Sequence, residues 1–137
     1  MATLLLVDTA ARDFSQAPIT DVEAAATFRA VTNLFRLWSV NDEQAAILLD
    51  LPLRSYRRWK AGEIGRFDRD RKARLSNIMG IHKALRIIFR ELQRGYAWMQ
   101  TANIAFGGQT ALGVMLGGEM TDLMRVRRYL DSERGGW

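Results

Sequence analysis

The sequence predicts an all-α fold for this chain of 137 residues. Apolar residues recur in steps of three and four over residues 21–38 and again over residues 69–94, which is the spacing of one helical face. Helix-capping residues precede the helical segments: Thr20 forms a capping box with Glu23, and Asn41 can cap the next helix. No segment alternates apolar and polar residues as a half-buried strand does. We therefore expect helices joined by short loops, with no β-sheet.

Residues 1–19 are expected to be a flexible N-terminal arm, because they mix apolar and polar residues in no sustained period. The apolar start at residues 3–7 is too short for the core of a signal peptide and has no basic region before it. No run approaches the roughly 20 apolar residues of a membrane helix. The chain also contains no cysteine, which suits a reducing compartment. We expect a cytoplasmic protein without a membrane partner.

Residues 20–64 contain a predicted helix-turn-helix, with two short helices over residues 42–49 and 53–61. Such helices cross closely, so the first needs a small residue, and apolar residues are needed before the turn and along the second. Residues of these kinds stand at the required positions: Ala46, Leu49, Leu51, Tyr56 and Trp59. Asp50 occupies the turn and tolerates a left-handed backbone better than most residues do. The third helix should end at Gly62.

Residues 65–137 are expected to form a second helical region. Its first helix, over residues 69–94, carries two apolar stripes and should pack on two sides. After Gly95, glycines separate short helices. These helices are expected over residues 96–100, 110–116 and 119–133. A small core is expected from Leu112, Leu116, Leu123, Val126 and Leu130.

The net charge of +5 favours a polyanionic partner, because each phosphate neutralised by Lys or Arg releases condensed counterions. If Tyr56 and Trp59 face the core, the opposite side of that helix is cationic. We expect base reading by Arg54 and Ser55 and phosphate contacts by Arg57, Arg58 and Lys60. The alternative is a solvated helix face. The basic run at residues 66–74 is interpreted as a helix entrance with local ion pairs, although Arg66, Arg69 and Arg71 could touch flanking phosphates.

The C-terminal half resembles the toxin-binding domain of the Xre/MbcA/ParS-like antitoxins, and the helix-turn-helix resembles Xre-type repressors. The resemblance rests on NIAFGG at residues 103–108, LGG at residues 116–118 and VRRYLDSERGG at residues 126–136. It implies an antitoxin that covers the active site of a RES-type toxin, an NAD-consuming enzyme encoded by the adjacent gene. It also implies that the complex represses its own operon by binding operator DNA.

The same resemblance places the toxin contacts on the last helix and tail, so the expected toxin-binding residues are Arg127, Arg128, Asp131, Arg134 and Trp137. Trp137 follows two glycines at the end of the chain, where a partner's pocket would order it better than an internal contact. The alternative is that Trp137 folds back on the last helix or is disordered. Asn103, Phe106, Gly107 and Gly108 are interpreted as turn and core residues.

An enzyme is not expected. His82 is the only histidine, lies on an apolar stripe, and has no nucleophile arranged around it. With no cysteine and one histidine, we expect no metal site, and the glycine pairs lack the Lys and Ser/Thr of a phosphate-binding loop, so no cofactor is expected.

Two other functions stay open at this point: a stand-alone regulator that uses its C-terminal half only to dimerise, and an adaptor for an enzyme that is not a toxin. A homodimer suits the antitoxin and the regulator, because two-fold DNA sites need paired recognition helices. We expect Leu85, Phe89 and Leu92 to be partly exposed on the long helix and to serve that dimer.

Overall fold

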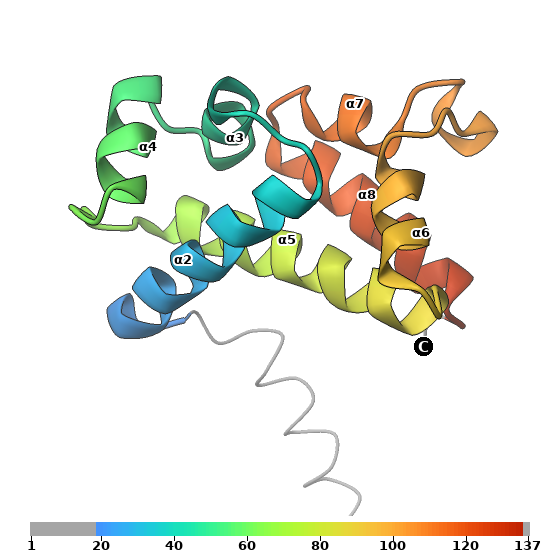
Figure 1. The fold of residues 1–137 in the computed structure, drawn as a ribbon, viewed down its shortest axis with the longest axis horizontal. Helices are drawn as coiled ribbons and strands as arrows, with labels where there is room; N and C mark the ends of the chain where they lie inside the picture. The colour runs from blue at the N-terminus through green and yellow to red at the C-terminus, as the bar shows by residue number, and fades with distance from the viewer. Residues whose placement is uncertain (1–18, 136–137) are drawn as a thin grey trace, which may run out of the picture.

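The structure, a computed structural model, describes residues 19–135, and over this range it confirms the predicted all-α fold (Figure 1). In chain order the elements are α2 (Asp21–Leu37), α3 (Asp42–Leu49), α4 (Leu53–Lys60), α5 (Arg69–Ile88), α6 (Leu92–Met99), a short 3-10 turn η1 (Ile104–Phe106), α7 (Ala111–Met115) and α8 (Met120–Glu133). The described range holds one isolated antiparallel bridge, between Ala102 and Thr110, and no strand. The arm predicted over residues 1–19 lies outside this range except for Ile19.

The predicted helix starts in the N-terminal half are confirmed by their caps. Thr20 and Glu23 form the capping box of α2, with the Thr20 hydroxyl accepting from the Glu23 amide at 3.1 Å. Asn41 accepts from the Gln44 amide at 2.8 Å and so caps α3. Gly62, with φ of 116°, ends α4 as predicted. Local signals thus place these three helices to within about one residue.

The prediction of a single long helix over residues 69–94 is wrong. The chain leaves the helix at Phe89, whose backbone is extended (φ −103°, ψ 123°), and re-enters one at Leu92. Gly95 does not separate two elements but lies buried inside α6, where its missing side chain makes room for the ring of Phe89. The apolar stripe continues through the bend, so periodicity alone could not reveal it.

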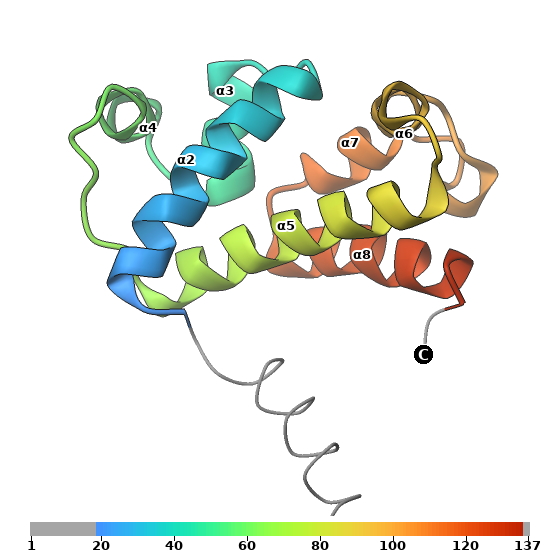
Figure 2. The same cartoon turned by 60° about the horizontal axis from the view of Figure 1, so that its bottom comes forward.

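Helix α5 is the central element of the molecule (Figure 2). Helix α2 crosses the N-terminal half of α5 and lies on the same side of it as α3 and α4. Helix α8 lies along the length of α5, and α6 packs at the C-terminal end of α5. The ion pair between Lys72 and Asp21, at 2.9 Å, fastens α5 to the first turn of α2. One helix therefore supports both the N-terminal and the C-terminal halves.

The core is continuous from one half to the other. It runs from Phe28 and Trp38 of the first half through Ile78 of α5 to Leu123 of α8, all almost completely buried. Of the small C-terminal core that the sequence predicts, Leu116 is half-buried and the other four residues are buried.

The dimer face predicted on the long helix must be corrected. Leu85 is completely buried within the chain and cannot contact a second copy, and Phe89 is half-buried. Only Leu92, at the start of α6, is exposed. The reason is the bend after Ile88, because it turns α6 back over the face of α5 that carries Leu85.

Candidate functional site

Helices α3 and α4 form the predicted helix-turn-helix. Asp50 adopts the left-handed conformation that its place in the turn requires, with φ of 55° and ψ of 48°. The Leu51 amide donates to the Ala46 carbonyl at 2.9 Å and closes the end of α3. Ala45 and Ala46 are both buried, and their small side chains allow the neighbouring helices to approach closely.

Two aromatic residues fix the orientation of α4. Tyr56 and Trp59 are buried, and their rings pack edge-to-face on Phe28 of α2 at centroid distances of 5.9 and 6.0 Å. Trp59 also contacts Phe67 at 4.8 Å. Gly65 passes directly over the indole, where an added Cβ would come within 2.6 Å of Trp59. Because these contacts fix one face of α4, the opposite face is held toward solvent.

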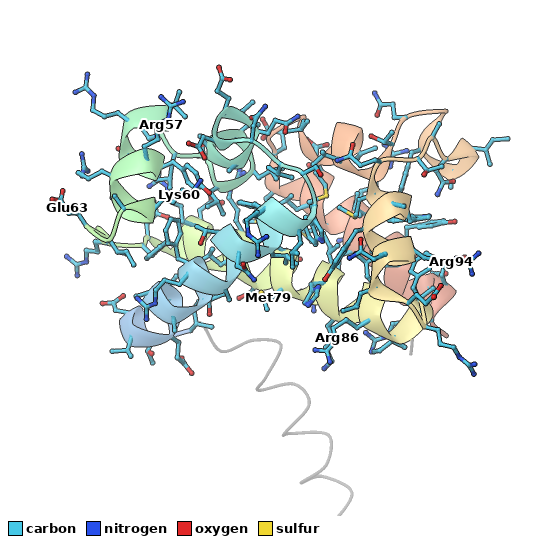
Figure 3. The ribbon with its side chains drawn as sticks, in the orientation of Figure 1. Arg57, Lys60, Glu63, Met79, Arg86 and Arg94 are labelled. Carbon is cyan, nitrogen blue, oxygen red and sulfur yellow. The ribbon has the colours of Figure 1, made fainter. Side chains whose placement is uncertain are left out.

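The exposed face of α4 carries the residues predicted to bind DNA. The side chains of Arg54, Arg57, Arg58 and Lys60 are exposed, and Ser55 is half-buried. Figure 3 labels Arg57 and Lys60 on this helix. Within residues 19–135, neither Arg54 nor Arg58 takes part in an ion pair. The structure therefore gathers the five predicted residues on one helix, with four cations accessible to a polyanion.

An acidic partner that sequence reasoning missed lies across the turn. Asp42, in the first turn of α3, pairs with Lys60 at 2.8 Å and with Arg57 at 3.3 Å. The hydrogen bond from Lys60 is the main cause that holds the pKa of Asp42 below its usual value. The Lys60 ammonium also lies 6.0 Å from the centre of the Tyr56 ring, and burial raises the pKa of that phenol to about 12. Two of the four cations are thus already partly neutralised.

Two arginines of α5 hold the end of α3. Arg71 donates to the Asp50 carbonyl from both Nε (3.0 Å) and Nη2 (2.6 Å), and it also pairs with Asp68. Arg74 is buried, donates to the Leu48 carbonyl at 3.1 Å and pairs with Asp70. These bonds satisfy carbonyls that the end of a helix leaves without partners. The basic run is a helix entrance with local ion pairs, as interpreted, and Arg71 is used to position the turn.

In the C-terminal half, the side chain of Arg127 extends from α8 to α5. Its guanidinium packs over Gly80, where an added Cβ would approach within 2.5 Å, and it donates to Asn77 Oδ1 at 3.3 Å. Asp131 faces Arg127 at 3.8 Å and Arg134 at 3.6 Å. Of the residues predicted to bind toxin, these three form one network along α8, and Arg128 is exposed beside them. Trp137 lies outside the described residues.

The segment NIAFGG forms a compact turn, as the sequence indicates. Asn103 Oδ1 accepts from the Ala105 amide at 2.9 Å, and Gly107 and Gly108 both have positive φ. Phe106 is buried, and its ring packs edge-to-face on Trp98 (6.2 Å) and Tyr129 (5.1 Å). The turn is thereby anchored to both α6 and α8.

His82 is half-buried, consistent with a structural role. Its ring stacks on that of Tyr96, with the ring centroids 6.5 Å apart, and borders a hollow of about 310 Å³. Met79 and Arg86, which Figure 3 labels, also line this hollow. Burial is the main cause that lowers the pKa of His82, and Arg86 adds to it. Residues 19–135 hold no cluster of acidic or histidine side chains suited to a metal ion. In the same range, no helix is both long and apolar enough to cross a bilayer.

Two known domains match the chain, and together they define its class. Residues 17–80 match the antitoxin Xre-like helix-turn-helix domain, which agrees with the geometry of α3 and α4. Residues 84–136 match the antitoxin Xre/MbcA/ParS C-terminal toxin-binding domain, which contains α6, η1, α7 and α8. The protein is thus an antitoxin of a toxin–antitoxin pair, with a helix-turn-helix half and a half that matches a toxin-binding domain.

The chain belongs to the Xre/MbcA/ParS-like antitoxin family, as the sequence motifs indicate. A curated relative, the uncharacterized protein y4oB of Sinorhizobium fredii (strain NBRC 101917 / NGR234), is 41% identical over 100 residues. That match covers 72% of this chain and 77% of the relative.

Proposed function

We propose that this antitoxin neutralises a RES-type, NAD-consuming toxin encoded by the adjacent gene. In this proposal the C-terminal half covers the active site of the toxin, with Arg128, Arg134 and Trp137 on the contact face. The observation that carries it is the match to a toxin-binding domain together with the exposed side of α8. Arg128 is exposed there, whereas Arg127 bonds to Asn77 of α5.

The proposal includes repression of the operon through α4. The exposed cationic face, with Arg54 and Ser55 in the first turn, has the composition expected of a recognition helix. A homodimer would present two such helices to a two-fold operator. The dimer contact would use a surface other than Leu85, since that residue is buried.

Growth of cells that express the adjacent gene tests the neutralisation. Expression of that gene alone should arrest growth, and supplying the antitoxin in trans should relieve the arrest. A chain truncated after Asp131 should fail to relieve it, because the truncation removes Arg134 and the tail. If the neighbouring gene is harmless, or if its toxicity is unaffected by this chain, the RES assignment is wrong and a stand-alone regulator becomes the better description.

An operator-binding assay tests whether DNA binding and toxin neutralisation use separate surfaces of the chain. The double variant Arg54→Ala/Arg57→Ala should lose binding to the promoter fragment in an electrophoretic mobility assay and should still rescue growth. If this variant loses rescue and DNA binding together, the two activities do not use separate surfaces.

A further inference from the structure

The C-terminal half contains a segment without charged residues. From Gly95 to Gly118 the sequence holds no Asp, Glu, Lys or Arg, although these make up 26% of the chain. Much of this segment is at the surface rather than in the core. Its exposed residues around the turn are Thr101, Ala102, Ile104, Ala105, Gly107, Gly108 and Gln109. Depletion of charge distinguishes the centre of a protein interface from the remaining surface.

Ile104 is the most prominent side chain of this surface. It is 94% exposed, against 54% for Ile87 and 41% for Leu92. Its exposed neighbours in the sequence, residues 101, 102, 105 and 107–109, are uncharged, and most of them are small. An isoleucine this exposed contributes little to the fold, because it gives up almost none of its contact with water.

The turn that carries Ile104 is held rigidly. The Phe106 and Gly108 amides both donate to the Asn103 carbonyl at 3.0 Å, and the Asn103 amide donates to the Gln109 carbonyl at 3.0 Å. Beneath the turn, the buried Phe106 ring is covered by the Arg125 guanidinium at 5.4 Å. A partner would therefore meet Ile104 in one orientation, and little conformational entropy would be lost on binding.

We propose that Ile104 is an anchor that inserts into an apolar recess of the toxin, with residues 101–109 as its uncharged rim. The occupant is the toxin because the turn lies within residues 84–136, the toxin-binding match. The Phe106 ring packs on Tyr129, so the turn adjoins α8, the helix proposed to contact the toxin. This inference rests on the proposed function, and it adds an apolar contact to the charged contacts proposed on α8.

The test compares two aspartate substitutions. Ile104→Asp places a charge at the proposed anchor, and Ile87→Asp places the same charge at another exposed isoleucine of the matched domain. Affinity for the purified product of the adjacent toxin gene would be measured by titration calorimetry with the full chain. Ile104→Asp should weaken binding about tenfold or more, and Ile87→Asp should change it less than about twofold. The melting temperature of Ile104→Asp should match that of the wild type, since the side chain is exposed.

The outcomes separate this inference from the proposed function. If the wild type does not bind that toxin, the proposed function fails. If the wild type binds and Ile104→Asp binds equally well, or if both variants lose affinity equally, the anchor is overturned. A change of oligomeric state on Ile104→Asp, with toxin affinity unchanged, would assign the surface to a second copy of this chain and would also overturn it.

Discussion

Asp42 determines how much of the charge on α4 is available to a phosphate. Its carboxylate pairs with Lys60 and Arg57, two of the four exposed cations of α4. A phosphate that contacts either cation must compete with this carboxylate. The side chains of these three residues are 31–59% exposed, so the competition would cost a phosphate little.

Replacing Asp42 with Asn should strengthen DNA binding. The substitution removes the competing charge while keeping the shape of the side chain, so Arg57 and Lys60 become available to phosphates. We expect an affinity severalfold higher and a steeper dependence on salt, measured by fluorescence anisotropy between about 50 and 200 mM salt.

Glu43→Gln is the matched control, because Glu43 lies in the same first turn of α3 and forms no ion pair within residues 19–135. It removes the same formal charge and leaves Arg57 and Lys60 paired. An equal gain in affinity from both variants would attribute the effect to net charge and would contradict a specific role of Asp42.

His82 should make the stability of the fold depend on pH. Its pKa is lower in the folded chain, so the unfolded chain binds more protons as the pH falls. The folded chain is therefore most stable at pH values above the ordinary histidine pKa, and its free energy of unfolding decreases as the pH falls through the lowered pKa of His82. Thermal melting at pH values from about 7.5 to 5.5 should show this loss, and His82→Gln should reduce it. An unchanged pH profile in the variant would exclude His82 as its cause.

At the scale of elements, the N-terminal helices could be predicted almost to the residue, because Thr20, Asn41 and Gly62 act within one turn of the chain. The exposed face of α4 followed from the spacing of Tyr56 and Trp59. The bend at Phe89 could not be predicted, since no proline or glycine marks it. Contacts between helices were also missed. The ion pair of Asp42 with Lys60 and the bonds of Arg71 to the Asp50 carbonyl depend on how the helices pack, which the local sequence does not specify.

Arg71 should influence DNA binding through the position of the turn. Removing its two bonds to the Asp50 carbonyl in Arg71→Ala loosens the turn between α3 and α4, so operator affinity should fall about tenfold. Because the Arg71 guanidinium is already bonded to the Asp50 carbonyl and paired with Asp68, we expect it to be unavailable to a phosphate, and the slope of log affinity against log salt should stay that of the wild type. Arg58→Ala should reduce that slope by about one. A reduced slope in Arg71→Ala would show instead a direct phosphate contact.

At the scale of the whole molecule, the shared helix predicts cooperative unfolding. Ile81 of α5 is completely buried, and Ile81→Ala should cost about 2–5 kcal/mol of stability. Because α5 packs on both α2 and α8, the loss should appear equally in both halves. Native-state hydrogen exchange of α4 and α8, followed by mass spectrometry, measures this. Faster exchange confined to α8 would mean that the halves open independently.

The bonds from α5 to the end of α3 have a consequence for building hybrid antitoxins. A helix-turn-helix region transplanted onto this toxin-binding half must bring its own Arg71 and Arg74, because these residues hold the turn between α3 and α4. The recipient half must keep its own Asn77 and Gly80, because its Arg127 bonds to Asn77 and packs over Gly80. The junction of such a chimera therefore belongs between Arg74 and Asn77, inside α5, and not in the loop that precedes this helix.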